Sequence, residues 1–462
     1  MYTGHNLNDT ITALATPPGV GAIAVIRLSG KAAIDIINER FPAKDLHAQA
    51  SHTIHLGTIR DEENRVLDEV LVSLFKAPTS YTREDVVEVS CHGSNYIVQS
   101  LLRLFIRNGA RSAQPGEFTM RAFLNGQMDL SQAEAVADLI ASDSESAHGL
   151  AMSQMRGGFS DEIKDLRGQL IDFASLIELE LDFGEEDVEF ADRDDLKQLI
   201  FKIQRILTNL IDSFQLGNVL KNGVNTVIAG RPNAGKSTLL NALLNEERAI
   251  VSPIAGTTRD TIEEVLNING ISFRLIDTAG IRDAQDTIEA VGVEKTFEKI
   301  KSSSILVYVY DAAEMSAEEV RNDLAKLQTE KIPLLVIANK ADLIKQDDVN
   351  PLSEESPNKT SLRISAADKT NIDTVKTALH DLVLAGNLNL DQTIVTNARH
   401  YDALRLADAA LNQVLFGMDS GVTSDFIAMD IRQALHYLGS ITGEISTDDL
   451  LGNIFSNFCI GK

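Results

Sequence analysis

The sequence predicts a multidomain protein of the α/β and α classes, with a doubly wound α/β domain inserted into a helical domain. A phosphate-loop pattern lies in mid-chain between a β-rich stretch and a helical one, and helical periodicity flanks this region on both sides. Strand patterns and turn residues fill the N-terminal segment, which indicates an α+β domain. The expected domains are residues 1–125, a helical part at 126–222, the insert at 223–385 and a second helical part at 386–462.

The composition favours a reduced, cytoplasmic protein without a membrane anchor. The chain has 462 residues, a formal net charge of −25 and two cysteines, Cys91 and Cys459. Two cysteines make no disulfide framework, no apolar run is long enough to cross a bilayer, and the N-terminus lacks the pattern of a secretion signal. The net charge argues against nonspecific nucleic-acid binding, which needs clustered Lys and Arg.

Four strands and a helix are expected in the N-terminal domain. ITALATPPGVGAIAVIRLSG (11–30) predicts two strands around a Pro-Pro-Gly turn, and VLVSLFKAP (70–78) and EDVVEVSCHG (84–93) predict two more. NYIVQSLLRLFIRNG (95–109) has helical periodicity.

Helical periodicity starts at residue 131, where Ser131 and Glu134 predict a capping box. It continues to about residue 222 and returns at 397–416 and 425–443, so the two helical blocks are expected to form one bundle. An acidic stretch at 178–195 interrupts it. A solvated helix end and loop is the favoured interpretation of that stretch, and a metal site is the minor alternative, because the carboxylates lack ligand spacing.

GRPNAGKS (230–237) fits the phosphate-loop pattern G-x-x-x-x-G-K-[ST]. VNTVIAG before it predicts a strand and TLLNALLN after it predicts a helix, the context that this motif requires. Backbone N–H groups around Gly235 would cradle phosphate oxygens at a helix N-terminus. Lys236 would reach the β- and γ-phosphates, and the Ser237 hydroxyl would bind Mg²⁺.

Two later motifs have the order and spacing of the metal and γ-phosphate contacts of a GTPase. GTTRD (256–260) supplies Thr258 for the metal. DTAG (277–280) places Asp277 to hold Mg²⁺ through water and the Gly280 N–H to sense the γ-phosphate.

Two further motifs select the base. In NKAD (339–342), Asp342 can accept two N–H bonds from the guanine edge, and adenine offers no such donor pair. In SAAD (365–368), the backbone near Ala366 would meet the guanine carbonyl. Together the motifs predict GTP rather than ATP.

Ras-like GTPases carry a water-orienting Gln after DTAG, but this chain has Ile281, whose apolar side chain cannot orient water. Hydrolysis is therefore slow, or another group takes over. The candidates downstream are Arg282, Asp283, Gln285, Asp286 and Glu289.

Seven segments spread along the chain carry a resemblance: DTITALATPPGVGAIAVIRLSG, PGEFTMRAFLNGQMDLSQAEAVADLI, LDFGEED, GRPNAGKSTLLN, IAGTTRD, DTAGIR and the terminal FCIGK. Together they resemble the MnmE (also TrmE) family, the bacterial and organellar tRNA-uridine modification GTPases. The resemblance implies an N-terminal folate-binding domain that dimerises, and a helical bundle that holds the GTPase domain as an insert.

The resemblance also implies a reaction and a partner. With MnmG (GidA), an FAD-dependent protein that uses NADH, the family installs carboxymethylaminomethyl or aminomethyl groups at C5 of the wobble uridine of certain tRNAs. The carbon comes from a tetrahydrofolate derivative, 5,10-methylene or 5-formyl, and the amine comes from glycine or ammonium.

Four folate contacts are carried over from the family. Arg27 suits the glutamate tail of a folate and Glu88 suits the amino edge of its pterin. Lys462 is implied near the folate. Gln127 stands where many members have Lys, so this chain loses a charge contact there.

The resemblance implies that K⁺ takes the place of an arginine finger, with Asn233, Ser252, Ile254 and Thr257 as its ligands. It also implies that Glu289 orients the attacking water. K⁺ is also implied to favour pairing of two GTPase domains. The expected GTP-binding residues are Asn233, Ala234, Gly235, Lys236, Ser237, Thr238, Ser252, Thr257, Thr258, Asp277, Thr278, Ala279, Gly280, Asn339, Lys340, Asp342, Ser365 and Ala366.

Cys459 lies four places from the C-terminus. A prenylation signal is disfavoured, because the last residue is Lys462 and no basic cluster assists anchoring. The resemblance places Cys459 beside the folate as a nucleophile or an acid, and a small packed residue is the alternative. Cys91, at a strand end, is expected in the core.

Two functions remain open from the sequence. The first is the GTP-hydrolysing component of a tRNA-modifying complex, and the second is a regulatory, ribosome-associated GTPase without group-transfer chemistry. The GTPase domain alone cannot separate them, since a fold does not fix a function. The N-terminal domain and FCIGK favour the first.

Overall fold

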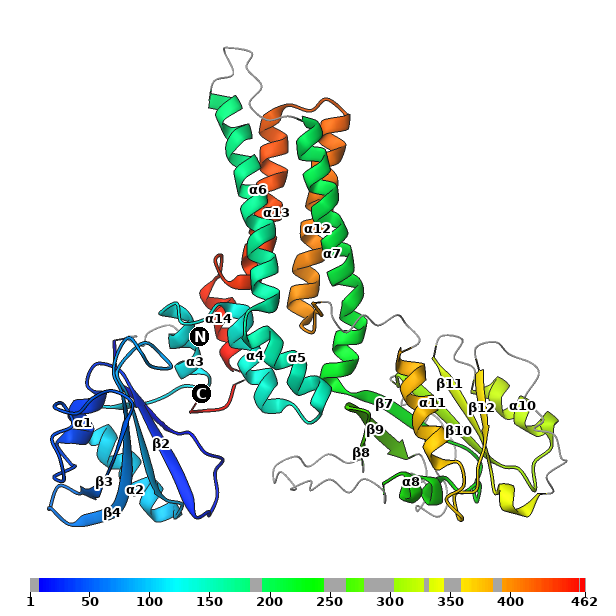
Figure 1. Cartoon of the computed structure of the whole chain (residues 1–462), viewed down its shortest axis with the longest axis horizontal. Helices are drawn as coiled ribbons and strands as arrows, with labels where there is room; N and C mark the ends of the chain where they lie inside the picture. Colours follow the sequence, from blue (N-terminus) through cyan, green and yellow to red (C-terminus); the bar gives the residue numbers. More distant parts are fainter. Residues whose placement is uncertain are drawn as a thin grey trace, which may run out of the picture. The chain divides into compact units, whose positions relative to one another are not determined.

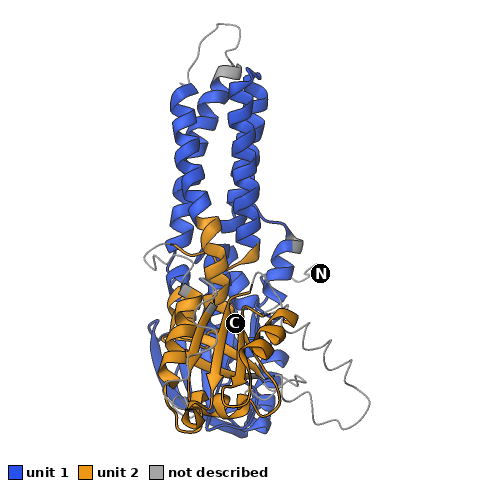
Figure 2. Ribbon diagram, turned by 90° about the vertical axis from the view of Figure 1, so that its right-hand side faces the viewer, with its two compact units in different colours: residues 1–140, 152–209, 399–462 blue, residues 141–151, 210–398 orange. Residues whose placement is uncertain are grey.

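The computed structural model describes residues 8–182, 193–244, 263–277, 303–327, 332–344, 359–384, 393–456 and 458–461. The chain divides into two compact units, coloured separately in Figure 2. Unit 1 consists of Met1–Ile140, Met152–Asn209 and Arg399–Lys462, and unit 2 consists of Ala141–Ala151 and Leu210–Ala398. The predicted insert, residues 223–385, lies within unit 2.

Unit 1 begins with a six-stranded sheet in the order β3-β4-β5-β2-β1-β6 (Figure 1). Neighbouring strands are antiparallel except β1 and β6, which are parallel. The strands are β1 Ile11–Leu14, β2 Ile23–Ser29, β3 Thr53–Arg60, β4 Val66–Phe75, β5 Val86–His92 and β6 Arg111–Ser112.

Helices α1 (Ala33–Asn38) and α2 (Asn95–Arg107) belong to the same hydrophobic core as this sheet. Alternate strand residues such as Ile26 and Val89 are buried with Phe105 of α2, as period-2 alternation requires. The four strands and the helix that the sequence predicts in this domain are confirmed.

The sequence pattern does not predict β3, because two of its apolar side chains are exposed and a polar side chain is buried. Ile54 and Leu56 are 66% and 61% exposed, whereas the polar His55 is buried. Gly57 interrupts the alternation further, and a Cβ there would lie 2.6 Å from both Phe41 and Ala43. The strand is therefore held by its pairing with β4 and by close packing at Gly57.

The rest of unit 1 is helical. The helices are α3 Glu117–Leu124, α4 Leu130–Ala141, α5 Glu145–Met155, α6 Gly158–Asp182, α7 Arg193–Asn222, α12 Ala398–Asp419, α13 Ser424–Thr442 and α14 Asp448–Ser456; α4, α5, α7 and α12 each cross a boundary between the units. In Figure 1, α6, α7, α12 and α13 run side by side. Their buried side chains repeat every three or four residues, which makes one apolar stripe per helix. These side chains include Ile163, Leu170, Ile200, Ile203, Leu404, Leu411, Ile431 and Leu438.

The predicted capping box of Ser131 and Glu134 is wrong. Asp129 and Gln132 form it instead, because the Gln132 N–H donates to Asp129 Oδ1 at 3.0 Å and the Asp129 N–H donates to Gln132 Oε1 at 2.9 Å. Glu134 lies inside α4 and is buried against Arg399 and His400 of α12, a pairing that short-range sequence cannot reveal.

Unit 2 contains a sheet in the order β12-β11-β10-β7-β9-β8, in which only β8 is antiparallel to its neighbour. The order reverses next to β7, which makes that strand end a topological switch point. The strands are β7 Val224–Ala229, β8 Glu263–Ile268, β9 Ile271–Asp277, β10 Ile305–Asp311, β11 Leu334–Asn339 and β12 Lys359–Arg363. The helical elements are α8 Lys236–Leu244, α10 Ala317–Lys326, the short 3₁₀ helix Ala341–Leu343 and α11 Ile372–Leu384.

This topology confirms the doubly wound α/β prediction. β10 is buried along its whole length, as expected for a parallel strand covered on both faces. Among the helices that can be described, none is both long and apolar enough to cross a bilayer.

Candidate functional site

The phosphate-loop motif connects β7 to α8, as the sequence predicts. Gly230 and Gly235 have φ angles of +155° and +89°. A Cβ at Gly230 would lie 2.0 Å from the Val309 carbonyl oxygen, so only glycine fits between the loop and β10. Lys236 is buried at the start of α8, and its Nζ donates to the carbonyls of Gly230 and Arg231 at 2.9 and 3.0 Å.

Asn339 joins this loop to the loop after β12. Its side chain is 2% exposed. Nδ2 donates to the Ala234 carbonyl at 2.9 Å, and Oδ1 accepts the Ala366 N–H at 3.0 Å. Three of the predicted GTP-binding residues are therefore connected by one amide group. The Ala366 N–H, expected beside the guanine carbonyl, is used in this connection.

The residues expected to bind guanine follow β11 and β12. Asp342 is exposed in the 3₁₀ helix. Lys340 has a left-handed backbone, with φ of +63°, and its Nζ donates to the buried Asp311 at 2.6 Å, a hydrogen bond that raises the pKa of Lys340. Ser365 is buried and its Oγ accepts the Asp368 N–H at 3.2 Å, which fixes the turn.

Sequence reasoning missed the side chain of Arg231 in the phosphate loop. Its guanidinium pairs with two carboxylates of α10, Asp323 at 2.7 Å and Glu319 at 2.9 Å. Asp323 also accepts the Tyr308 hydroxyl of β10 at 2.8 Å. Only the tertiary structure reveals this tether between the loop and α10, since the partners lie about ninety residues away.

Several predicted residues lie outside the described part of the chain, and Asp277 is described only as the last residue of β9. The residues outside are Ser252, Ile254, Thr257, Thr258, Thr278, Ala279, Gly280, Glu289 and Lys462.

Unit 1 brings two of the expected folate contacts together, because Arg27 of β2 and Glu88 of β5 are cross-strand partners. Both Arg27 Nε and Nη2 donate to Glu88 Oε1, at 2.8 and 2.7 Å. The guanidinium also lies 5.6 Å from the ring of Tyr81 and 5.7 Å from that of Phe118. The Gly461 carbonyl of the C-terminal tail accepts from Arg27 at 3.4 Å. The guanidinium of Arg27 is thus bound by other groups of the same chain.

Gln127, the third expected folate contact, is exposed at the end of the α3 segment. Its Oε1 accepts a hydrogen bond from Arg83 Nε at 2.9 Å. The sequence singled out Gln127 for its missing charge, and the structure places a guanidinium next to it.

The two cysteines have different surroundings. Cys91 is 4% exposed in the core, where burial and then the nearby Asp68 raise the pKa of its thiol to about 11, so the predicted core position is confirmed. Cys459 is exposed, while its neighbours Phe458 and Gly461 are buried. Within the single chain, the thiol of Cys459 is therefore not packed, and its role stays a prediction.

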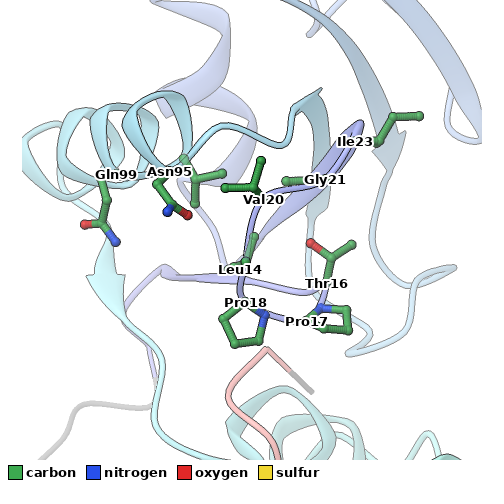
Figure 3. A pocket seen from close by; sticks show the side chains of 12 residues that line it. Leu14, Thr16, Pro17, Pro18, Val20, Gly21, Ile23, Asn95 and Gln99 are labelled. Atoms are coloured by element: carbon green, nitrogen blue, oxygen red, sulfur yellow. The ribbon is translucent and has the colours of Figure 1, made fainter. Parts of the chain in front are cut away.

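A cavity of about 320 Å³ opens beside the loop that follows β1 (Figure 3). Its walls are mainly apolar, its polar side chains are uncharged, and Arg27, Glu88 and Gln127 do not line it. The C-terminal tail passes close to one lining residue, Leu14. A Cβ at Gly461 would lie only 2.3 Å from the Leu14 carbonyl oxygen. The lining residues are Leu14, Thr16, Pro17, Pro18, Gly19, Val20, Gly21, Ile23, Ala24, Asn95, Val98 and Gln99.

The fold of unit 2 and its phosphate, guanine and metal motifs define a P-loop GTPase. Comparison with known proteins identifies the family. A family model described as "MnmE helical domain" matches residues 130–459, and one described as "GTP-binding protein TrmE N-terminus" matches residues 10–127.

Curated relatives match along the whole chain. A protein of Cytophaga hutchinsonii named "tRNA modification GTPase MnmE" is 58% identical over 460 residues, which is 100% of this chain and 99% of that protein. One of the same name from Christiangramia forsetii is 54% identical over 473 residues, which is 99% of this chain and 100% of that protein. The chain belongs to the MnmE (TrmE) family.

Solved structures match only weakly. A GTP-binding protein from Sulfolobus solfataricus, in complex with GDP, is 20% identical and covers 48% of this chain and 68% of its own, with a TM-score of 0.28. A likeness of this size supports no argument about function.

Proposed function

We propose that this protein is the GTP-hydrolysing component of a complex that installs carboxymethylaminomethyl or aminomethyl groups at C5 of the wobble uridine of certain tRNAs. The observation that carries the proposal is the membership of the whole chain in the MnmE family, with both the N-terminal and the helical family models matched. GTP and tRNA are met in the cytoplasm, where the protein is expected to act.

The nucleotide site uses the groups already described. Lys236 presents an ammonium at the N-terminus of α8, where backbone N–H groups and the helix dipole favour phosphate oxygens. The exposed Asp342 accepts hydrogen bonds from the guanine edge. Asn339 fixes the phosphate loop relative to the loop after β12 through its hydrogen bonds to Ala234 and Ala366.

Mg²⁺ fits the exposed hydroxyl of Ser237 at the first turn of α8, with Asp277 at the end of β9 as an outer partner. When bound, the ion neutralises charge on the β- and γ-phosphate oxygens. The Ser237 hydroxyl has no partner in the described residues, so it is available as a ligand.

K⁺ would be held by Asn233, whose exposed side chain projects from a left-handed residue with φ of +62°. Among the described residues this amide has no hydrogen-bond partner. A monovalent cation there would supply the positive charge that an arginine finger supplies elsewhere. Ser252, Ile254 and Thr257 are its other proposed ligands, and Glu289 is proposed to orient water.

The reduced folate would lie over the Arg27–Glu88 pair. Glu88 uses only Oε1 for Arg27, and within the described part of the chain Oε2 has no partner. That oxygen is suited to the amino edge of a pterin, while Arg27 keeps the carboxylate oriented. Arg27 is proposed to position Glu88, because its Nε and Nη2 both donate to that carboxylate. Lys462 stays a proposed contact.

Cys459 is proposed to act in the modification chemistry, because its exposed thiol belongs to the tail whose Gly461 carbonyl meets Arg27. The proposed assembly is a homodimer that works with the FAD-dependent MnmG protein on tRNA. The acidic chain, with a net charge of −25, favours a partner that supplies most of the basic surface.

Two measurements test the biochemical part of the proposal. GTP turnover in K⁺ is expected to exceed turnover in Na⁺ at equal ionic strength, and equal rates would remove the K⁺ role. The purified chain is expected to bind 5-formyltetrahydrofolate. A chain that hydrolyses GTP but has no folate affinity would favour the regulatory, ribosome-associated alternative.

A further inference from the structure

Arg83 projects from a rigid loop between β4 and β5. The preceding Thr82 is fully buried, with its Oγ1 2.6 Å from Ser29 Oγ and its carbonyl bound to Asn125 Nδ2 at 2.7 Å. The following Glu84 accepts from Ser29 Oγ at 2.6 Å. The exposed Arg83 side chain is therefore presented by a backbone that is fixed on both sides.

The guanidinium of Arg83 is held by neutral groups only. Nε donates to Gln127 Oε1 at 2.9 Å and Nη1 donates to the Asn125 carbonyl at 3.2 Å. Across the described ranges no carboxylate lies within 4.0 Å of it, although the chain carries 67 acidic residues. Its backbone φ is +59°, which is disfavoured for a long side chain. The residue is thus a fixed, uncompensated cation.

The same loop connects Arg83 to the folate contacts. Tyr81, two residues before it, places its ring 5.6 Å from the Arg27 guanidinium, and Arg27 holds Glu88. The loop and strand therefore carry an aromatic ring at Tyr81, a cation at Arg83 and a carboxylate at Glu88. A folate has a complementary group for each of them: an aromatic benzoyl ring, glutamate carboxylates and a pterin with N–H donors.

We infer that Arg83 binds the glutamate carboxylates of the folate, with Gln127 fixing the orientation of its guanidinium. The inference rests on the folate-binding part of the proposed function. Nη2 has no partner in the part of the chain that the structure describes, so it can donate to a carboxylate. Arg27 is less suited to this role, since its charge is paired with Glu88 through Nε and Nη2 and its Nη1 donates to the Gly461 carbonyl.

The test is calorimetric binding of two ligands to the full-length protein: 5-formyltetrahydrofolate and 5-formyltetrahydropteroate, which lacks the glutamate. Four proteins are compared, namely wild type, Arg83→Gln, the double variant Arg83→Gln/Gln127→Lys and the control Arg103→Gln. Arg103 is an exposed arginine of α2, so its replacement changes the net charge equally.

Wild type and Arg103→Gln should prefer the glutamate-bearing ligand. Arg83→Gln should bind that ligand about three- to tenfold more weakly while its affinity for the pteroate stays the same, and Gln127→Lys should restore the preference because it returns a cation to the adjacent position. Equal weakening for both ligands would mean that Arg83 only supports the loop, and an unchanged preference would mean that another residue binds the tail. Either result overturns the inference while folate binding stands. A wild type that binds neither ligand would overturn the folate proposal and this inference together.

Discussion

Asn339 donates from Nδ2 to the carbonyl of Ala234 at 2.9 Å, so a single buried side chain holds a phosphate-loop residue that lies 105 positions away in the sequence. A Cβ at Gly235 would lie 2.1 Å from the same Nδ2, so the loop passes this amide at a distance that only glycine allows. The conformation of the phosphate loop therefore depends on a residue of the base-recognition motif.

Replacing Asn339 by Ala should weaken binding of both GDP and GTP. Loss of the amide leaves the Ala234 carbonyl and the Ala366 N–H without a partner, and an unsatisfied buried group costs about 1–3 kcal/mol. Nucleotide affinity should fall on the order of 10- to 100-fold, measured with fluorescent GDP. The exposed Asn412→Ala on α12 is the control, and unchanged affinity in Asn339→Ala would contradict the connecting role.

Replacing Asp342 by Asn should change the base that is bound. An amide can donate where the carboxylate only accepts, so the site should lose affinity for GTP and gain affinity for xanthosine triphosphate, whose base has a carbonyl at the 2-position. Competition binding with the two nucleotides measures this. A uniform loss of both affinities would show that Asp342 supports the fold and does not read the base.

The buried Glu134 should make stability depend on acid pH. Burial alone would raise the pKa of Glu134, but the charge and hydrogen bond of His400 and the hydrogen bonds of Arg399 lower it from 4.5 to about 2. Because the folded pKa lies below the unfolded one, the contribution is complete above about pH 4.5 and is lost as pH falls toward 2. It amounts to on the order of 3 kcal/mol.

Chemical denaturation of wild type and Glu134→Gln between pH 7 and pH 3 measures this contribution. The difference in stability should be largest at pH 7 and should shrink as the pH falls. Glu178→Gln, which removes an exposed pairing with Arg432, should show a small effect. A difference that does not vary with pH would contradict the assignment.

The two thiols should react at different rates with a thiol reagent in the native protein. Cys459 is exposed and should be modified first, whereas the buried Cys91 should react only after unfolding, because its pKa of about 11 leaves little thiolate at neutral pH. One fast equivalent in wild type and none in Cys459→Ser is the expected result. Two fast equivalents would place Cys91 at the surface.

The sequence predicts local patterns well and long-range pairings poorly. The phosphate loop, the strand before it and the helix after it depend on neighbouring residues, and the structure has all three where they are expected. Glu134 looks like half of a capping box until Arg399 and His400 are brought to it from far along the chain. β3 escapes prediction because its polar His55 is turned inward and its apolar neighbours outward.

The same limit applies to the folate contacts. The sequence names Arg27, Glu88 and Gln127 singly, and only the sheet register shows that Arg27 and Glu88 satisfy each other. Only the loop conformation shows that Arg83 lies beside Gln127. A pairing between residues 44 positions apart leaves no periodic signal in the sequence.

The central claim is that this chain acts in modification of the wobble uridine. Mass spectrometry of nucleosides from tRNA of cells that lack the gene tests it most directly. We expect 5-carboxymethylaminomethyl- and aminomethyl-uridines to disappear, the wild-type gene to restore them, and a copy carrying Asp277→Ala not to restore them. Unchanged wobble uridines in cells without the gene would contradict the claim and favour a regulatory GTPase.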